Sequence, residues 1–274
     1  MPIISIDGTS DPRLADFEAV PDPELLRSRN QFVVEGRFAI QTLLREPRFH
    51  LRALLLTKNT FRVLARELSG QLLETVFVYI TSAANFKIGG YDFHRGYLAL
   101  VDRPEPIPVC RIISAVESRN PILALDRIGN PDNIGGLFRN AAAFSVEAVL
   151  LGPGCCDPLY RKAIRTSIGK TLQIPFSTTN EWSVTLDALR AKGYVVVALT
   201  PDQKESIELK EFLSFFENQR RVVWLLGAEG DGLSEEALDA ADFRVRIPLN
   251  QSVDSLNVAT AAAIALHRLW EYDD

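Results

Sequence analysis

The chain has 274 residues, 47% of them hydrophobic and 24% charged, with a net charge of −5. This composition is typical of a globular protein with one large domain or two smaller ones. No stretch approaches the ~18 consecutive apolar residues of a membrane span and the N-terminus lacks the features of a signal peptide, so we expect no membrane partner. The three cysteines form no disulfide framework, so we expect a reducing, cytoplasmic location.

The charge is distributed unevenly along the chain. Residues 1–26 hold one Arg against six Asp or Glu, and residues 27–103 hold twelve Lys or Arg against six acidic residues. Residues 104–274 hold seventeen basic against twenty-three acidic residues. A basic segment therefore lies between an acidic leader and an acidic C-terminal part, a pattern that by itself gives weak support for a polyanionic partner.

Helical and strand patterns alternate after the leader and predict a small α/β domain over residues 27–103. The predicted elements are a helix at 37–45, a strand at 51–57, a helix at 61–68, and strands at 76–81 and 97–101. Three prolines follow at positions 104, 106 and 108. Because proline fixes φ and removes an amide donor, residues 104–119 are predicted to form a stiff linker.

The alternation is stronger over residues 120–274. Predicted strands lie at 122–126, 148–151, 194–200, 222–226 and 243–248, and predicted helices at 134–144, 182–192 and 258–270. Several of the strands are short runs of β-branched and other apolar residues, which is typical of strands buried on both faces. The pattern predicts an α/β domain with a mostly parallel sheet and helices on both faces.

Several familiar signatures are absent. Gly169-Lys170-Thr171 resembles the end of a phosphate-binding loop, but Ile164 occupies the position of its first glycine. No GxGxxG follows the first strand of the second domain, which argues against a dinucleotide dehydrogenase. His50, His94 and His267 are far apart and have no metal-ligand spacing, so no metal is predicted.

The first of three candidate motifs follows the strand at 122–126. Asp132 or Asn133 is expected to cap the next helix. Gly135 and Gly136 precede Arg139 by four and three residues, so its guanidinium could reach back over a turn without side chains. Arginine beside free helix N–H groups favours a phosphate or a ribose oxygen. A capped helix with an ordinary arginine salt bridge is an equally good interpretation.

The second motif follows the strand at 222–226. Gly227, Gly230 and Gly232 lie within six residues, and Ser234 is expected to begin a helix. Glycines permit positive φ and let a ligand approach the backbone closely. The alternative, a tight strand-to-helix turn, needs only one such glycine.

The third motif begins where Pro248 ends the last predicted strand. Ser255 is the expected N-cap of the C-terminal helix, whose small residues 259–263 allow very close packing, for example against a second subunit. Taken alone, this segment is better explained as a capped, alanine-rich core helix.

Together and in this order, the three motifs resemble the SpoU/TrmH family, RNA ribose 2′-O-methyltransferases of the knotted SPOUT superfamily. The matching residues are Asn133, Gly135, Arg139 and Ala141, then Gly227, Glu229, Gly232 and Leu233, then Ile247, Pro248 and Ser255–Ala259. The resemblance covers residues 120–272. Residues 27–103 resemble, more loosely, the ribosomal-protein-like RNA-binding domain that many members carry.

The resemblance implies a trefoil knot, a homodimer and S-adenosylmethionine as the cofactor. Together with the charge distribution and the prolines, it divides the chain into a leader (1–26), which has no counterpart that we can name in the family, an RNA-binding domain (27–103), a linker (104–119) and a SPOUT methyltransferase domain (120–274). The cofactor residues carried over from the family are Leu226, Gly227, Ala228, Glu229, Gly230, Ile247, Leu249, Leu256 and Asn257.

The resemblance also places Arg139 at the reacting ribose. Asn133, Glu229, Ser255 and Asn257 would orient the ribose and the cofactor. For RNA binding we select five basic residues, namely Arg27, Arg29, Arg37, Arg95 and Arg165. Arg165 belongs to a second basic group, which also contains Arg161, Lys162 and Lys170 and is expected on the RNA-facing side of the methyltransferase domain or as solvated helix charge.

Ribosomal RNA is the favoured substrate, by analogy with family members that carry an added N-terminal domain. A transfer RNA methyltransferase of the same family is the alternative. A non-catalytic RNA-binding protein that keeps the fold is a rival, and so is a knotted enzyme that methylates a base nitrogen.

Overall fold

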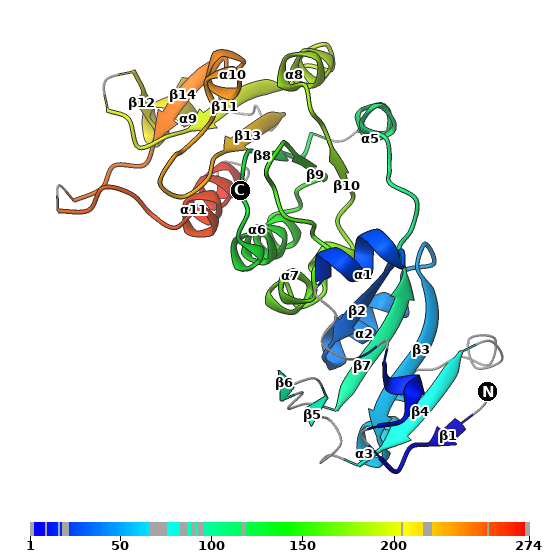
Figure 1. Cartoon of the computed structure of the whole chain (residues 1–274). Coiled ribbons are helices and arrows are strands. Elements are labelled where there is room, and N and C mark those ends of the chain that lie inside the picture. Colours follow the sequence, from blue (N-terminus) through cyan, green and yellow to red (C-terminus); the bar gives the residue numbers. More distant parts are fainter. Residues whose placement is uncertain are drawn as a thin grey trace. The chain divides into compact units, whose positions relative to one another are not determined.

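The computed structural model describes residues 3–8, 10–15, 17, 22–65, 76–82, 87–88, 91–92, 96–116, 119–203, 205–215, 221–250 and 252–271. The chain forms two compact units (Figure 1). The first comprises Met1–Glu105 and Leu159–Gln173, and the second comprises Pro106–Pro158 and Ile174–Asp274. None of the helices in the described ranges is long and apolar enough to cross a lipid bilayer.

A five-stranded mixed sheet lies at the centre of the first unit. Its strand order is β1-β4-β3-β7-β2, with β4 parallel to β1 and β3, and β7 antiparallel to β2 and β3. The strands are β1 (Ile3–Ser5), β2 (Gln31–Glu35), β3 (His50–Thr57), β4 (Phe77–Thr81) and β7 (Tyr97–Asp102). The other elements of this unit are η1 (Pro12–Leu14), α1 (Asp22–Ser28), α2 (Arg37–Leu43), α3 (Lys58–Leu64), α7 (Arg161–Thr166), η3 (Lys170–Leu172), and the antiparallel pair of β5 (Lys87–Ile88) and β6 (Tyr91–Asp92).

The predicted acidic leader is part of this unit rather than a separate segment. Its strand β1 pairs with β4, and the Thr81 hydroxyl donates to the Ile6 carbonyl at 3.0 Å. Leu14 and Phe17 are completely buried, and the Phe17 ring packs edge-on against Tyr79. These apolar residues help to fill the core of the first unit. The net charge of residues 1–26, on which the prediction of a separate leader rests, gives no information about them.

Residues 159–173 pack on the first unit, although the sequence predicts them within the methyltransferase domain. The Arg161 amide donates to the Asp22 carboxylate at 2.9 Å, and Arg165 lies 3.6 Å from Glu35. At the other end of the segment, the Arg48 guanidinium donates to the Leu172 carbonyl at 2.7 Å. Arg161, Lys162, Arg165 and Lys170 therefore group with the first unit, whereas the sequence places them in the methyltransferase domain; their role at the RNA stays a prediction.

The second unit contains a seven-stranded sheet in which every recorded pair is parallel. The order is β10-β9-β8-β13-β11-β14-β12. The strands are β8 (Ile122–Leu125), β9 (Ala148–Leu151), β10 (Phe176–Thr178), β11 (Val195–Leu199), β12 (Ile207–Glu208), β13 (Val222–Leu226) and β14 (Phe243–Arg246). This confirms the predicted mostly parallel α/β sheet.

Successive residues of a strand point to opposite sides, so these apolar strands give the sheet two apolar faces. Helices cover both of them. Ile122 and Ala124 of β8 belong to a core shared with α5, α8 and α10. On the other face, the Trp224 ring of β13 packs against Phe212 of α9 at 5.9 Å. The helices of this unit are α5 (Val109–Ala115), α6 (Pro131–Ala143), α8 (Trp182–Arg190), α9 (Leu209–Phe215), α10 (Glu235–Asp239) and α11 (Val258–Glu271).

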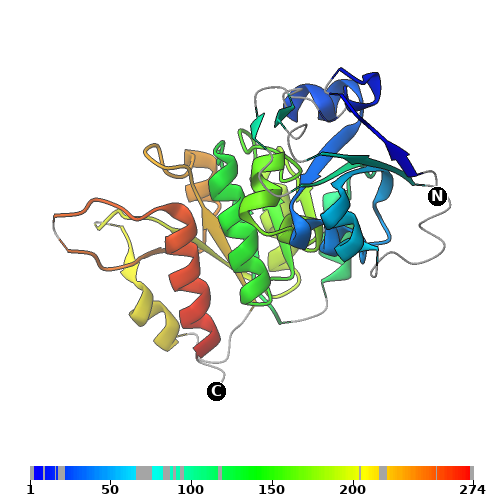
Figure 2. The same ribbon diagram turned by 90° about the horizontal axis from the view of Figure 1, so that it is seen from below.

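The helices α6 and α11 lie side by side, as Figure 1 and Figure 2 both show. A Cβ placed on Gly136 would lie 2.9 Å from the Cβ of Ala259, and the Asn140 amide donates to the Ala259 carbonyl at 2.7 Å. At Ala259, the alanine-rich helix therefore finds a close partner in its own chain. Gly136 therefore lets the two helices approach each other closely. It does not leave a face of α6 free for the Arg139 side chain.

Gly136→Ala is expected to destabilise the second unit. The added methyl group overpacks the α6–α11 contact at a cost of about 1–3 kcal/mol, which exceeds the gain of ~1 kcal/mol in helix propensity. Ala259→Gly in the same chain should restore most of the loss, because it moves the methyl group from one helix to the other.

Denaturant unfolding followed by tryptophan fluorescence measures this effect, because all three tryptophans lie in the second unit. If Gly136→Ala alone raised the stability of the unit, or if Ala259→Gly gave no recovery, the close approach of the two helices would be refuted.

Candidate active site

A cavity of about 350 Å³ lies beyond the carboxyl ends of β11, β13 and β14, three neighbouring strands of the second unit. Ligands of parallel sheets commonly bind at this edge, and the volume lies within the range of small-molecule sites, about 300–1,000 Å³. The residues that line it come from the segments 199–201, 226–232, 247–249 and 254–261.

The cavity collects almost all the residues predicted to hold a cofactor. Those that line it are Leu226, Gly227, Ala228, Glu229, Gly230, Ile247, Leu249 and Leu256; Asn257 does not. Ser255, predicted as a catalytic residue, also lines it. Leu199, Thr200 and Pro201 lie outside the three motifs and were not predicted; they reach the cavity because β11 lies between β13 and β14.

The glycines of the second motif shape the loop that forms one wall of the cavity. A Cβ on Gly227 would lie 2.3 Å from the carbonyl carbon of Gly232, so this glycine is required by the loop itself. Ala228 and Gly232 exchange two backbone hydrogen bonds of 3.1 and 3.2 Å, which close the loop. Gly230 and Gly232 have φ values of +88° and +69°, where L side chains are strained.

The Asn257 side chain joins three parts of the site. Its Oδ1 accepts from the Ala259 and Thr260 amides at 3.0 and 3.3 Å and so caps α11. Its Nδ2 donates to Asn133 Oδ1 at 2.8 Å and to Glu229 Oε1 at 2.6 Å. The predicted capping role of Ser255 is therefore wrong, because the helix begins three residues later, at Val258.

The cap of α6 also differs from the prediction of Asp132 or Asn133. Asn130 is the N-cap, and its side chain accepts from the Asp132 amide at 2.9 Å. Pro131 occupies the first helical position, where its missing amide donor costs nothing. Asn133 is thus a buried residue of the first turn, and its side chain is available to Asn257.

Arg139 is not brought to the cavity. Its side chain is exposed, and it forms no hydrogen bond or ion pair with the described part of the chain. The structure therefore assembles Asn133, Glu229 and Asn257, while Arg139 lies farther along α6.

The predicted RNA-binding arginines that the structure describes belong to the first unit. Arg27, Arg29, Arg37 and Arg165 are all exposed, and Arg165 pairs with Glu35. Arg95 lies outside the described residues.

Cys155 is a half-buried thiol beside the end of β8. Its Sγ donates to the Leu125 carbonyl at 3.1 Å and accepts from the Ile128 amide at 3.3 Å. Burial raises the pKa of this thiol to about 11, so it is neutral at physiological pH and acts as a hydrogen-bonding group rather than a nucleophile. Among the described residues, no three potential metal ligands lie together.

Comparison with known proteins agrees with the motifs. The SpoU rRNA Methylase family matches residues 120–267. An uncharacterized tRNA/rRNA methyltransferase of Mycobacterium tuberculosis, Rv0881, is 35% identical, over 94% of this chain and 88% of that protein. The 23S rRNA (guanosine-2′-O-)-methyltransferase RlmB of Bordetella pertussis is 27% identical, over 64% of this chain and 69% of that protein.

The fold has a close counterpart among solved structures. An rRNA methyltransferase from Sinorhizobium meliloti, solved with AdoMet bound, matches with a TM-score of 0.82 and 21% identity over 99% of both chains. The chain therefore belongs to the SpoU rRNA methylase family. The predicted class of enzyme, an RNA methyltransferase, is confirmed.

Asn257→Asp is expected to lower the stability of the second unit by about 1 kcal/mol. The carboxylate keeps the helix cap but loses both donated hydrogen bonds and faces Glu229. Adding Glu229→Gln should recover most of the loss, because the glutamine amide can donate to the new carboxylate and the repulsion disappears. Tryptophan-detected unfolding of the three proteins measures both effects, and equal stability of all three would contradict the described network.

Proposed function

We propose that this enzyme transfers a methyl group from S-adenosylmethionine to a ribose 2′-hydroxyl of ribosomal RNA. The observation that carries the proposal is the cavity, because the second and third motifs of a SpoU family member line it together. The similarity to RlmB, named for guanosine 2′-O-methylation of 23S rRNA, supports the ribose and the ribosomal substrate. Transfer RNA is the alternative, since Rv0881 is named for either RNA.

The residues around the cavity fit S-adenosylmethionine. Leu199, Leu226 and Ile247 offer apolar walls to an adenine ring. The backbone is open at Gly230 and Gly232, where no atom lies within 4 Å of the position of a Cβ, so polar groups of a ligand can reach it. Glu229 adds a carboxylate to the lining for the positive charge of the cofactor.

The bound cofactor supplies a methyl group activated by its sulfonium, so that much of the acceleration can come from positioning the hydroxyl. Asn257 fixes the Glu229 carboxylate at the cavity wall and Asn133 beside it. Arg139 carries a permanent charge and is a poor proton acceptor. Because its guanidinium has no partner in the described part of the chain, we assign it to a phosphate or to the developing alkoxide of the RNA rather than to proton abstraction.

A homodimer completes this proposal. We propose that Arg139, which does not line the cavity of its own chain, lies at the cavity of a second copy in this homodimer. We also propose that the chain between β14 and α11 is threaded as the family's trefoil knot. The support is that this segment lines the cavity beside the loop 226–232 and that α11 returns to pack on α6.

We propose that the first unit captures the RNA. The support is the charge of residues 27–103 and the exposed positions of Arg27, Arg29 and Arg37. A cytoplasmic location remains part of the proposal, in keeping with three free cysteines.

Arg139→Ala is expected to reduce methyl transfer to ribosomal RNA at least 100-fold, on the order of the loss when one charge-stabilising donor is removed from a transition state. The affinity for S-adenosylmethionine should stay within about twofold, because Arg139 does not line the cavity. Labelled cofactor, total ribosomal RNA and nucleotide digestion measure the rate and the position of the label, and calorimetry measures the affinity.

The wild-type protein should place the label on a 2′-O-methylated nucleotide. Label on a base nitrogen, or cofactor binding without transfer to any RNA, would refute the proposed reaction. Full activity of Arg139→Ala would remove this residue from the mechanism.

Reversing the charges of Arg27, Arg29 and Arg37 to Glu should weaken RNA binding at least tenfold and flatten its salt dependence, because fewer counterions are released. The matched control is charge reversal of Arg111, Arg119 and Lys210, which are exposed residues of the second unit. RNA-binding curves measured at several salt concentrations compare the affinities of the two variants with that of the wild type. An equal effect of both sets, or of neither, would exclude the first unit as the RNA reader.

A further inference from the structure

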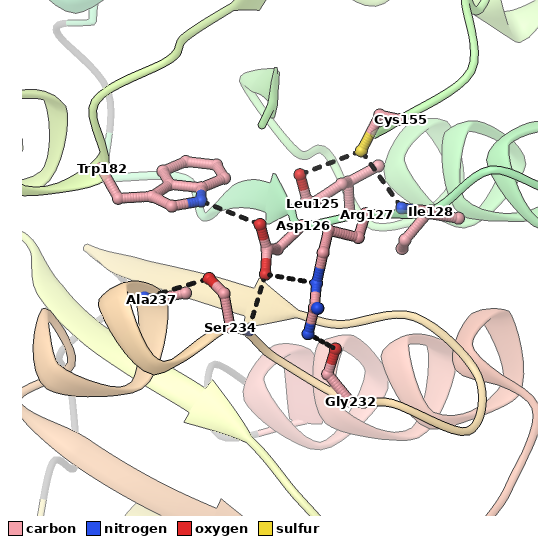
Figure 3. A network of polar contacts seen from close by, with 9 residues as sticks. All are labelled: Leu125, Asp126, Arg127, Ile128, Cys155, Trp182, Gly232, Ser234 and Ala237. Carbon is pink, nitrogen blue, oxygen red and sulfur yellow. Dashed lines mark hydrogen bonds and ion pairs between the residues drawn. The ribbon is translucent and has the colours of Figure 1, made fainter. Parts of the chain in front are cut away.

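A buried carboxylate lies behind the cavity loop, at a residue to which the sequence analysis gave no role. Asp126 follows β8 directly and is only 1% exposed. Its Oδ1 accepts from the Trp182 indole N–H at 3.1 Å, and its Oδ2 accepts from the Ser234 amide at 2.8 Å (Figure 3). One carboxylate thus connects β8, the start of α8 and the end of the glycine loop.

Arg127 adds a second connection to the same loop. Its Nε lies 3.7 Å from the Asp126 carboxylate, and its Nη2 donates to the Gly232 carbonyl at 3.2 Å, as Figure 3 shows. The backbone of Arg127 has a φ of +58°, which is unfavourable for a residue with a Cβ. A strained conformation persists only where the surroundings hold it, and here it directs the guanidinium toward the loop.

These contacts hold the end of the loop that forms the cavity wall. Gly227 follows β13 and is fixed by the sheet, whereas Gly232 and Ser234 are held from behind by Arg127 and Asp126. Gly232 lines the cavity and also closes the loop on Ala228. Ser234 in turn caps α10 through the Ala237 amide.

We propose that Asp126 and Arg127 are positioning residues for the cofactor, which hold residues 227–234 in the conformation that S-adenosylmethionine requires. This inference rests on the proposed function. Neither residue lines the cavity, so both act through the loop. A loop that is fixed before binding loses less conformational freedom when the ligand arrives, and its affinity for the ligand is correspondingly higher.

Arg127→Gly separates this role from a purely structural one. Glycine relieves the unfavourable φ, which offsets the loss of the half-exposed ion pair with Asp126, so the variant should unfold at about the same denaturant concentration as the wild type. At the same time it removes the anchor of Gly232. The dissociation constant for S-adenosylmethionine should therefore rise about tenfold, which corresponds to about 1.4 kcal/mol.

Ser145→Gly is the matched control. Ser145 has a φ of +53°, is exposed and belongs to the same unit, so glycine relieves similar strain there. Because Ser145 contributes nothing to the cavity or to its loop, its variant should bind the cofactor as the wild type does.

Amide hydrogen exchange in the absence of cofactor gives a second measurement. The amides of Gly232 and Ser234 donate to Ala228 and Asp126, and exchange reports how often these bonds open. Exchange at residues 230–234 should be about tenfold faster in Arg127→Gly than in the wild type or in Ser145→Gly. The lost contact to Gly232, which is expected to weaken cofactor binding about tenfold, should let these hydrogen bonds open about ten times as often.

The outcomes distinguish this inference from the proposed function. If the wild-type protein did not bind S-adenosylmethionine, the proposed function would fail, while the exchange rates would still test the anchoring of the loop. If the wild type bound the cofactor and Arg127→Gly showed the same affinity and the same exchange, the positioning role would be overturned. A fall in the stability of Arg127→Gly in proportion to its affinity would also overturn it, because the residue would then act on the fold as a whole.

Discussion

The site depends on the hydrogen bonds of the Asn257 side-chain amide. One side chain caps α11 with its oxygen and holds Asn133 and Glu229 with its nitrogen, so it ties the three sequence motifs together. The strand order brings the second and third motifs to one cavity, because β11, β13 and β14 are neighbours and the cavity lies at their carboxyl ends. Without this strand order the three motifs would be ordered along the sequence but not gathered in space, and without the Asn257 amide their side chains would not be joined.

The distribution of charge and the division into units have a common explanation. The cavity is built from apolar side chains, glycine backbone and a few carboxylates, and needs little positive charge. The arginines proposed to capture RNA lie on the first unit, where the sequence is basic. The segment 159–173 adds further basic residues to that unit. A net charge of −5 for the whole chain is therefore compatible with an RNA substrate.

The sequence predicted five of the seven strands of the second unit, and Ala148–Leu151 and Val222–Leu226 have the predicted bounds, because buried parallel strands are apolar throughout. It missed β10 and β12, which are only three and two residues long. It misplaced both caps. Residues near Asn130 and Asn257 are equally suitable as helix N-caps by residue type. The tertiary hydrogen bonds that join Asn257 to Asn133 and Glu229 determine which residue caps each helix. Leu199–Pro201 and Asp126 were missed because their roles depend on strand order and on contacts distant in sequence. The cofactor residues were found through family resemblance rather than periodicity.

We propose that the second and third motifs form one cofactor site in this chain. A crystal structure with S-adenosylmethionine bound would show where the cofactor lies. We expect the adenosine against Leu226, Ile247 and Leu256, with the loop 227–232 in the same conformation as in the present structure. Cofactor bound elsewhere on the second unit, or a loop rebuilt around it with the Asn257 hydrogen bonds broken, would refute the shared site.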